Sequence, residues 1–466
     1  MESPDSFDTE TARRYDQPGP RYTSYPAAPH FHEGFGEREY REYARLSNDE
    51  LIPRKLSLYV HVPYCFSPCF YCGCNRVITR DRAKGERYVE RLLVEIERTA
   101  PLFDRDRDVI QLHLGGGTPN FLDPVQLERL VESLSRHFYF SGSSERDFSI
   151  ELDPRHGSRR DIAALARIGF NRASLGVQDF DPEVQRAVNR VQSVEETLAT
   201  VDACRAAGMR SVNVDLIYGL PRQSLAGFAK TLDIVTEARP DRLAIYGYAH
   251  LPRLFKAQRQ IDGQDLPDAK LRLDLLRLAV DKLSAAGYRY IGLDHFALPE
   301  DDLARAQERG GLHRNFMGYT THANCDLIGL GVSAISHIGD SYSQNSRDLA
   351  GWEIALDQNR LPVHRGIELS FDDVLRGDVI QQVMCRGEVD VAATERRFAV
   401  SFRHYFADEW PRLVNLAEDG LLDLEGSRLA ATSRGRYLLR IIAMCFDRYL
   451  QNTHSTGGGI RYSRAI

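Results

Sequence analysis

From residue 55 onward, segments with the apolar spacing of a strand alternate with segments that have the apolar spacing of a helix. Short β-rich runs such as KLSLYVHV are followed by longer segments such as RYVERLLVEIERTAPLF, where apolar residues recur at the spacing of an amphipathic helix. Six strand-then-helix units in succession predict a parallel sheet with crossover helices. Because such crossovers are right-handed, the sheet can curl into a full or partial barrel. The expected strands lie within residues 55–62, 108–119, 147–154, 172–178, 211–221 and 242–252.

The segments on either side of this pattern lack its rhythm. Residues 1–50 are rich in proline, tyrosine, glycine and charge, without a clean helical or strand period, so we expect an extended arm that lies on the rest of the protein. A disordered tail is the alternative, but its aromatic residues argue against full disorder. We expect the barrel, which begins after the arm, not to need it for a core.

The second half of the chain changes character after residue 255. A helical segment and a strand-like YIGLDHFAL precede a long polar loop over 309–339, and several helical segments follow. The predicted organisation is therefore an arm at 1–50, a barrel core at 51–300, a barrel extension with a substrate or cofactor loop at 301–365, and an α-helical domain at 366–466. The one low-complexity tract is the glycine run at 457–459.

Composition excludes several classes of protein. The chain has 466 residues and a formal net charge of −6, with no long basic run that would indicate nucleic acid binding. Its polar, acidic start is not a signal peptide, and no apolar run is long enough to span a membrane. We therefore expect the protein to work in the cytoplasm.

Four of the eight cysteines fall within ten residues, in the run HVPYCFSPCFYCGCNR. The spacing Cys-x3-Cys-x2-Cys puts Cys65, Cys69 and Cys72 on one tight loop. Such a loop can hold three corners of a cubane iron–sulfur cluster and leave the fourth iron open for a cofactor. A zinc knot normally has two ligand pairs separated by a longer stretch, and disulfides are rare in cytosolic chains. We therefore favour the cluster over both alternatives.

Polar residues gather where the predicted strands end. Because the carboxyl ends of parallel strands meet at one mouth, these residues are expected to form one site. Any one of them, taken alone, is also an ordinary turn residue. After the cysteine loop that follows the first strand, the remaining strand ends carry Gly115–Thr118, Glu151 and Asp153, Gln178, Asp215, and His250.

The cysteine loop, with Tyr71 before its last ligand, resembles the signature of the radical S-adenosylmethionine (SAM) superfamily. The ordered set GPRYTSYP, GGGTP, IELDPR, SLGVQDFDPEVQRAVNR, VNVDLIYGLP, YAHLP, DHFA, LHRNFMGYTT, GVSAIS and YSRAI resembles the oxygen-independent coproporphyrinogen III oxidase (coproporphyrinogen dehydrogenase) family within it. The segments around Cys385 and at 321–324 depart from the family pattern. The resemblance implies a radical SAM partial (β/α)6-type parallel barrel with an N-terminal arm and a C-terminal α-helical domain.

The resemblance also implies an activity. Members convert two propionates of coproporphyrinogen III to vinyl groups, giving protoporphyrinogen IX in heme biosynthesis. They use a 5′-deoxyadenosyl radical formed from SAM at a [4Fe-4S] cluster, and they hold two SAM molecules. A heme chaperone or a heme-modifying radical SAM protein on the same fold is the alternative, but Cys74 and the GPRYTSYP arm favour the oxidase.

Residue roles follow from the matching positions. Cys65, Cys69 and Cys72 are the expected cluster ligands, with Cys74 and Tyr59 as catalytic residues beside the cofactor. Expected cofactor contacts are Tyr59, Tyr71, Cys74, Gly116, Gly117, Thr118, Glu151, Gln178, Arg190, Asp215, Ala249 and Ile335. Without the resemblance, we would predict that Arg190 is an exposed surface arginine and that Ala249 and Ile335 are core residues.

Substrate and partners are also implied only by the resemblance. The four propionates of the substrate need cations or donors, for which Arg21, Tyr22, His313 and Arg314 are candidates by motif position, although ordinary loop residues are an equal alternative. The expected partners are coproporphyrinogen III and a low-potential electron donor such as flavodoxin or ferredoxin. Neither nucleic acid nor membrane binding is expected, and the chain is expected to be a monomer.

Overall fold

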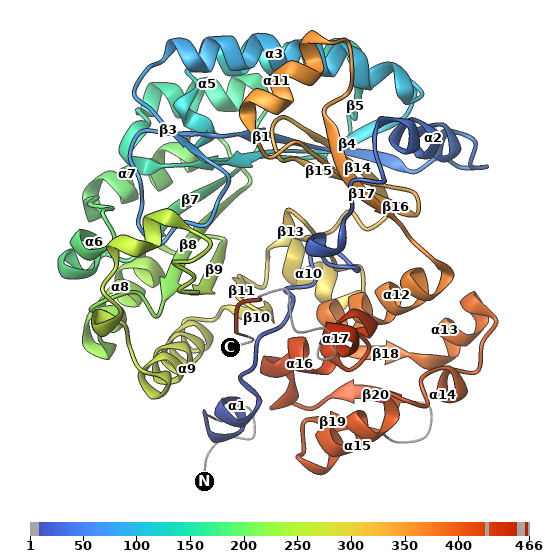
Figure 1. Ribbon diagram of the computed structural model, residues 1–466. Helices are drawn as coiled ribbons and strands as arrows, with labels where there is room; N and C mark the ends of the chain where they lie inside the picture. The colour runs from blue at the N-terminus through green and yellow to red at the C-terminus, as the bar shows by residue number, and fades with distance from the viewer. Residues whose placement is uncertain (1–8, 425–427, 454–461, 465–466) are drawn as a thin grey trace.

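A computed structural model describes residues 9–424, 428–453 and 462–464 (Figure 1). The first eight residues of the predicted arm, the glycine run at 457–459 and the last two residues of YSRAI lie outside the described residues. No helix in the described part of the chain is both long and apolar enough to cross a membrane.

The predicted succession of strand-then-helix units is confirmed. The six parallel strands are β1 (Lys55–Val62), β4 (Asp108–Gly116), β6 (Asp147–Leu152), β7 (Arg172–Gln178), β8 (Ser211–Tyr218) and β9 (Arg242–Gly247). The helices after them are α3 (Ala83–Thr99), α4 (Pro124–His137), α5 (Arg159–Ile168), α7 (Val194–Ala206), α8 (Leu225–Ala238) and α9 (Ala269–Ala285). The strands lie side by side in the order β9-β8-β7-β6-β4-β1, and the helices cover their outer face (Figure 1). The ends of the sheet do not pair with each other among the described strands, so the barrel is partial.

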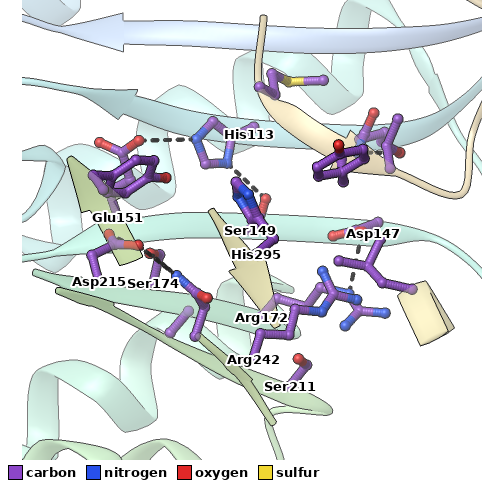
Figure 2. Close-up of a pocket in the computed structure, with 18 residues that line it drawn as sticks. His113, Asp147, Ser149, Glu151, Arg172, Ser174, Ser211, Asp215, Arg242 and His295 are labelled. Atoms are coloured by element: carbon purple, nitrogen blue, oxygen red, sulfur yellow. Dashed lines mark hydrogen bonds and ion pairs between the residues drawn. The ribbon is translucent and has the colours of Figure 1, made fainter. Parts of the chain in front are cut away.

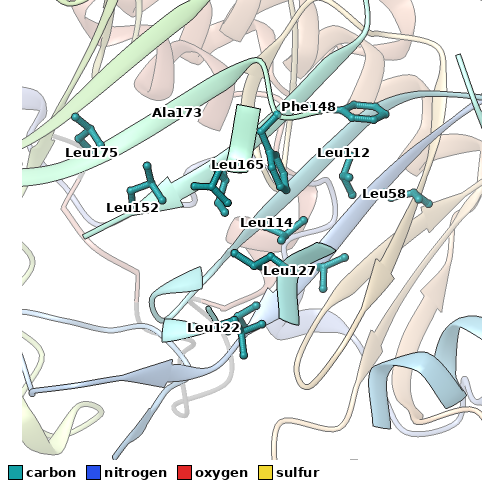
Figure 3. Close-up of a cluster of buried hydrophobic side chains, with 14 of the residues drawn as sticks. Leu58, Leu112, Leu114, Leu122, Leu127, Phe148, Leu152, Leu165, Ala173 and Leu175 are labelled. Carbon is teal, nitrogen blue, oxygen red and sulfur yellow. The ribbon is translucent and has the colours of Figure 1, made fainter. Parts of the chain in front are cut away.

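Strand alternation separates two environments. On β4, Leu112 and Leu114 are fully buried among the side chains that α4 and α5 contribute, including Leu127 and Leu165 (Figure 3). The intervening residues of the same strand face the inside of the barrel, because successive side chains of a strand point to opposite faces. The outer face therefore forms the hydrophobic core, and the inner face is free to carry polar groups.

The predicted long polar loop at 309–339 is wrong, because most of it is strand. It holds β12 (His313–Asn315), β13 (Gly318–Thr320), β14 (Cys325–Leu330) and β15 (Ile335–Ile338), followed by β16 (Ser341–Asn345) and β17 (Val363–Glu368). β14 lies parallel to β1 and extends the sheet beyond it. Its one charged residue is compensated, since Asp326 pairs with Arg107 at 2.5 Å and both side chains are almost fully buried.

Smaller elements complete the barrel side of the molecule. These are β2 (Tyr64–Cys65), β3 (Val77–Ile78), β5 (Tyr139–Phe140), α6 (Pro182–Ala187), β10 (Arg289–Gly292), β11 (His295–Ala297), α10 (Asp302–Glu308) and α11 (Leu349–Asp357).

The arm, predicted to be extended, is only partly so. It contains α1 (Thr9–Tyr15) and α2 (Glu37–Asn48). In α2, Tyr40, Ala44 and Ser47 form a buried stripe, which is the helical period that the surrounding prolines and glycines obscure. Tyr40 and Ala44 belong to the large core of the barrel, contrary to the expectation that the barrel core needs nothing from the arm.

The C-terminal part is mainly helical, as predicted, and has its own core. Its helices are α12 (Phe371–Arg386), α13 (Val391–Phe398), α14 (Phe402–Tyr405), α15 (Trp410–Glu418), α16 (Leu439–Met444) and α17 (Arg448–Thr453). A small antiparallel sheet, which the sequence did not indicate, joins β18 (Glu388–Asp390), β20 (Arg428–Ala431) and β19 (Leu422–Asp423). Tyr22 and Tyr25 of the arm are buried in this second core.

Candidate active site

The cysteine loop, residues 65–74, follows β1 at the carboxyl edge of the parallel sheet. Two backbone hydrogen bonds close it, from the Val77 amide to the Pro63 carbonyl at 2.8 Å and from the Thr79 amide to the Cys65 carbonyl at 3.0 Å. Arg76 donates to the carbonyls of Cys69 and Cys72 at 3.3 and 3.2 Å. These bonds fix the loop's backbone without using its thiols.

Each of the three predicted ligand sulfurs faces a different donor. Thr118 donates to Cys65 Sγ at 3.3 Å, Arg190 to Cys69 Sγ at 3.5 Å, and the Cys74 amide to Cys72 Sγ at 3.4 Å. Hydrogen bonds to sulfur stabilise thiolate charge and tune an iron–sulfur centre. The donor set therefore fits a cluster held by three thiolates.

The thiols are not gathered as a site for a single ion. In the described part of the chain, no three His, Cys, Asp or Glu side chains form a group that could hold one metal ion. A cubane places its thiolates on separate irons, so it does not need them to converge on one point. A side-chain hydrogen bond with Cys74 lowers the pKa of Cys72 below its usual value.

The glycine turn at the end of β4 lies directly against this loop. A Cβ added at Gly117 would come within 2.7 Å of the Pro63 carbonyl oxygen, and Gly116 has a φ of +118°. A side chain at Gly117 would clash with that carbonyl, and a residue other than glycine at Gly116 would be strained by its positive φ. The Gly116 amide donates to Glu151 at 3.1 Å, so the turn also positions a predicted site carboxylate.

Glu151 and Tyr59 are held together by a histidine. His113 Nε2 lies 3.3 Å from Glu151 Oε1 (Figure 2). The His113 ring stacks on Tyr59 with centroids 5.8 Å apart. Desolvation favours the neutral acid, but the hydrogen bond and charge of His113, with the Gly116 amide, lower the pKa of Glu151. Glu151 is therefore an anion facing the barrel interior at neutral pH.

Asp215 lies on the same inner face, on β8. It accepts hydrogen bonds from Ser174 at 3.0 Å and Asn213 at 2.8 Å (Figure 2). Burial, and then the charge of Glu151, raises the pKa of Asp215 to about 6. The negative charge of Glu151 therefore acts on Asp215 within the same cavity.

These side chains line a cavity of about 140 Å³ inside the barrel. The inward positions of consecutive strands form polar rows from floor to mouth, such as Asp147, Ser149 and Glu151 on β6. Ion pairs close the floor, from Arg172 to Asp147 at 3.2 Å and from Arg242 to Asp301 at 2.9 Å. Glu151 and Asp215 therefore lie at the end of the cavity nearer to the carboxyl ends of the strands, which the cysteine loop follows.

Arg190 is buried, contrary to its reading as a surface arginine. Its Nη1 lies 3.3 Å from Asp153 Oδ2, and Nη2 donates to the Gly176 carbonyl. Its Nε is buried and has no hydrogen-bond partner. Gln178, at the end of β7, has a φ of +71°. Its side-chain nitrogen Nε2 lies so close to Gly176 that a Cβ added there would come within 2.9 Å of it.

Tyr71, within the cysteine loop, and Ala249, which follows β9, are joined by one side chain. The Gln258 side chain donates to both of their carbonyls, at 2.9 and 3.1 Å. Tyr71 packs against the apolar group that includes Val184 and Ile217. Cys74 is exposed.

The remaining predicted residues lie elsewhere. Ile335 begins β15 and packs beside Phe31, Tyr342 and Ile367. Arg21 pairs with Asp294 and lies over the Tyr246 ring, which lines the barrel cavity. Three of the four substrate candidates, Tyr22, His313 and Arg314, instead line a second cavity of about 390 Å³ between the arm, β12 and α12.

Contacts of the substrate candidates differ among themselves. The buried Tyr22 hydroxyl donates to Asp447 at 2.9 Å. Burial lowers the pKa of His313 to about 4, so it is neutral near pH 7. Arg314 is buried over the Tyr319 ring, donates through Nε to the Arg21 carbonyl, and leaves Nη1 without a partner.

Several residues that shape the site were not predicted from the sequence. His113, Ser174 and Asn213 position the carboxylates, and Arg76 secures the loop. A signal was available for the first three, because they alternate with apolar residues in QLHLG, RASLG and SVNVD and therefore point inward. Arg76 carries no such pattern.

Comparison with known proteins agrees with this geometry. The Radical SAM superfamily profile matches residues 59–235, and the HemN C-terminal domain profile matches residues 369–438. An oxygen-independent coproporphyrinogen III oxidase from Pseudomonas aeruginosa is 49% identical over 460 residues, covering 99% of each chain. The Escherichia coli enzyme of the same name is 46% identical over 445 residues, covering 96% of each chain.

A solved structure is similarly close. Coproporphyrinogen III oxidase (HemN) from Escherichia coli, described as a radical SAM enzyme, superimposes with a TM-score of 0.90 at 44% identity, covering 95% of this chain and 99% of that one.

A cysteine loop at the mouth of a partial β/α barrel, with these matches, defines a radical SAM enzyme, a class that uses a [4Fe-4S] cluster and SAM. Within that class, the chain belongs to the oxygen-independent coproporphyrinogen III oxidase family.

Proposed function

We propose that this chain catalyses the oxygen-independent oxidative decarboxylation of two propionates of coproporphyrinogen III, giving the vinyl groups of protoporphyrinogen IX in heme biosynthesis. Each propionate loses a hydrogen atom from its β-carbon, one electron and carbon dioxide. The observation that carries the proposal is the cysteine loop, with a donor on each sulfur, at the mouth of a polar barrel in a chain related over 99% of its length to oxidases of that name.

Cys65, Cys69 and Cys72 would hold the [4Fe-4S] cluster, which together with SAM supplies a 5′-deoxyadenosyl radical. Around them, we assign the unpartnered Nε of Arg190 to the SAM carboxylate and Glu151 to its ammonium group. Asp215 and Gln178 suit ribose hydroxyls. Gly116, Gly117 and Thr118 let the backbone approach, and Tyr71 offers an aromatic face to the adenine.

A second SAM molecule is part of the proposal. Cys74 is exposed two residues beyond the last ligand, so it can reach a bound cofactor without being needed for iron. Ala249 and Ile335 would contribute backbone contacts. Tyr59 stacks on His113, which lines the cavity, and would help to bound the space in which the radical acts.

Substrate carboxylates need cations that are not already neutralised. Arg314, with Nη1 free of partners, supports this role best among the four candidates. Arg21 lies at the edge of the barrel cavity but is paired with Asp294. Tyr22 and His313 are assigned only to the lining of the second cavity.

The proposal also requires a source of electrons. We propose that a low-potential carrier such as flavodoxin or ferredoxin reduces the cluster, and that the protein acts as a monomer in the cytoplasm.

The test is anaerobic reconstitution followed by incubation with reductant, SAM and coproporphyrinogen III. Protoporphyrin fluorescence after oxidation, together with 5′-deoxyadenosine, is the expected result. Stable heme binding without turnover would instead indicate a heme chaperone, and loss of heme with formation of an opened ring would indicate a heme-modifying enzyme.

A further inference from the structure

Six cations lie on two segments that both contact the cysteine loop, one at the start of α3 and one between β6 and the first turn of α5. They are Arg80, Arg82, Lys84, Arg155, Arg159 and Arg160, and we call them the cationic face. Arg155 is half-buried and the other five are exposed.

Both segments contact the residue next to a predicted ligand. Phe66 follows Cys65 directly in the chain. The Arg82 guanidinium lies 4.6 Å from the Phe66 ring centroid, and the His156 ring lies 4.2 Å from it. The cationic face therefore borders the cysteine loop itself.

The six cations of this face outnumber the three acids on the same two segments, Asp81, Asp153 and Asp161, so an excess of positive charge remains. Arg155 pairs with Asp153 at 2.6 Å. Of the nearby acids, Asp81 accepts from the Ala83 amide, Asp161 caps α5, and Glu86 pairs with Arg129. Among the ion pairs between described residues, none includes Arg80, Lys84, Arg159 or Arg160.

This local excess opposes the charge of the whole chain. The formal net charge is −6, so an acidic protein is repelled on average and attracted only where cations concentrate. The cationic face can thus select the orientation in which such a partner meets the surface.

Arg159 and Arg160 lie at the positive end of a helix, where their charge is unfavourable. They are the first two residues of α5, directly after the N-cap Ser158, whose hydroxyl accepts from the Asp161 amide at 3.2 Å. The N-terminus of a helix carries partial positive charge, so cations in its first turn oppose the helix dipole. Helix stability therefore does not explain two adjacent arginines at this place.

We infer that the cationic face docks an acidic electron-carrier protein of the flavodoxin type, which passes one electron at a time to a cluster held by Cys65, Cys69 and Cys72. In each transfer the anionic flavin hydroquinone gives up one electron and becomes the neutral semiquinone, and a cluster held there would accept that electron and go from the 2+ to the 1+ state. The inference rests on the proposed function for its need of electrons. Electron-transfer encounters use small interfaces.

The test uses full-length reconstituted protein with Arg159→Glu and Arg160→Glu together. Affinity for flavodoxin at low salt should fall at least about tenfold, as expected for charge reversal in a steered encounter. Cluster reduction by flavodoxin hydroquinone, followed by absorbance, should slow to a similar degree. Reduction by titanium(III) citrate should not change. The melting temperature should stay the same or rise, because glutamates favour the first turn of a helix.

A matched control reverses two exposed arginines elsewhere, Arg396→Glu and Arg428→Glu. They lie on α13 and β20, at the lower right of Figure 1, whereas α5 and β3 lie at the upper left. This control should bind flavodoxin as the unaltered protein does. Equal effects of the two pairs, or flavodoxin binding that does not weaken with salt in the unaltered protein, would overturn the inference.

The inference and the proposed function fail separately. Flavodoxin binding and cluster reduction that depend on the cationic face, without protoporphyrin formation, would support the docking face while removing the proposed activity. If the double reversal leaves flavodoxin-driven protoporphyrin formation unchanged, the proposed activity is supported and the docking face is removed. If the double glutamate variant does not fold, Arg159→Gln with Arg160→Gln gives the same comparison with half the charge change.

Discussion

Arg190 places its Nη1 atom 3.5 Å from the sulfur of Cys69. Burial favours the neutral guanidine, but the neighbouring Tyr71, Asp153 and Cys69 groups raise the pKa of Arg190 above its usual value. The guanidinium therefore stays charged while touching both the cysteine loop and the end of β6. It joins the proposed ligands to the proposed SAM site.

Replacing this guanidinium should weaken SAM binding while leaving iron in place. In Arg190→Lys, the loss of the charge-assisted contact assigned to Nε, about 1.5–3 kcal/mol, should reduce SAM affinity roughly ten- to hundredfold. Calorimetry with SAM, beside iron analysis, is the measurement. Arg186→Lys, at an exposed arginine of α6, is the control. Unchanged SAM affinity would remove Arg190 from the cofactor site.

The cluster ligands can be separated from Cys74 by iron content. Cys65→Ala, Cys69→Ala and Cys72→Ala should each abolish a cluster of about four irons and four sulfides. Cys74→Ser should keep the cluster and lose product, and it serves as the matched control in the same loop. A full cluster in any of the first three, or lost iron in the fourth, would contradict the assigned ligand set.

Tyr22 gives a prediction about stability. Its buried hydroxyl is bonded to Asp447, so Tyr22→Phe should lower the free energy of unfolding by about 1–3 kcal/mol, the cost of an unsatisfied buried acceptor. Denaturant unfolding measures this, with the exposed Tyr139→Phe as control. Lost turnover at unchanged stability would instead assign the hydroxyl to the substrate.

Glu95 should make stability depend on pH. It is buried on α3 and accepts hydrogen bonds from the Gly331 amide, Asn345 and Trp352, yet burial raises its pKa to about 7. Because the folded state prefers the protonated acid, its contribution is complete below the unfolded pKa near 4.5 and is lost as pH rises through about 7.

The expected loss from Glu95 is about 3 kcal/mol between these limits. Glu95→Gln cannot ionise, so the stability difference between the two proteins should narrow from pH 5 to pH 8. Parallel unfolding curves at both values would show that Glu95 does not titrate in this range.

The strands and the cysteine loop were predictable because their signals are local. KLSLYVHV and its successors carry their period in a few residues, and the ligand spacing spans eight. β14 was missed because its partner β1 lies far away in the chain, and only that pairing explains a buried DLIGL. The helix α2 was missed because prolines and glycines before it made the whole arm look irregular.

The residues of the candidate site also fall into two groups, those that local sequence predicts and those that depend on distant segments. The three cysteines and the glycine turn can be found from sequence, because spacing and the need for a bare backbone are local properties. The burial of Arg190 and the Tyr22–Asp447 contact depend on segments joined only in three dimensions. No pattern around Tyr22 indicates that its hydroxyl faces α17 rather than the barrel.

The place of β1 between β4 and β14 also sets an order for synthesis. Lys55 begins a strand whose partner at Cys325 emerges from the ribosome about 270 residues later, on the order of tens of seconds at common elongation rates. Until then one edge of β1 has unpaired amides and carbonyls, which invite pairing with other chains. A nascent or truncated chain that ends before residue 325 therefore exposes the strand that carries the cysteine loop, and it is the form most prone to aggregate.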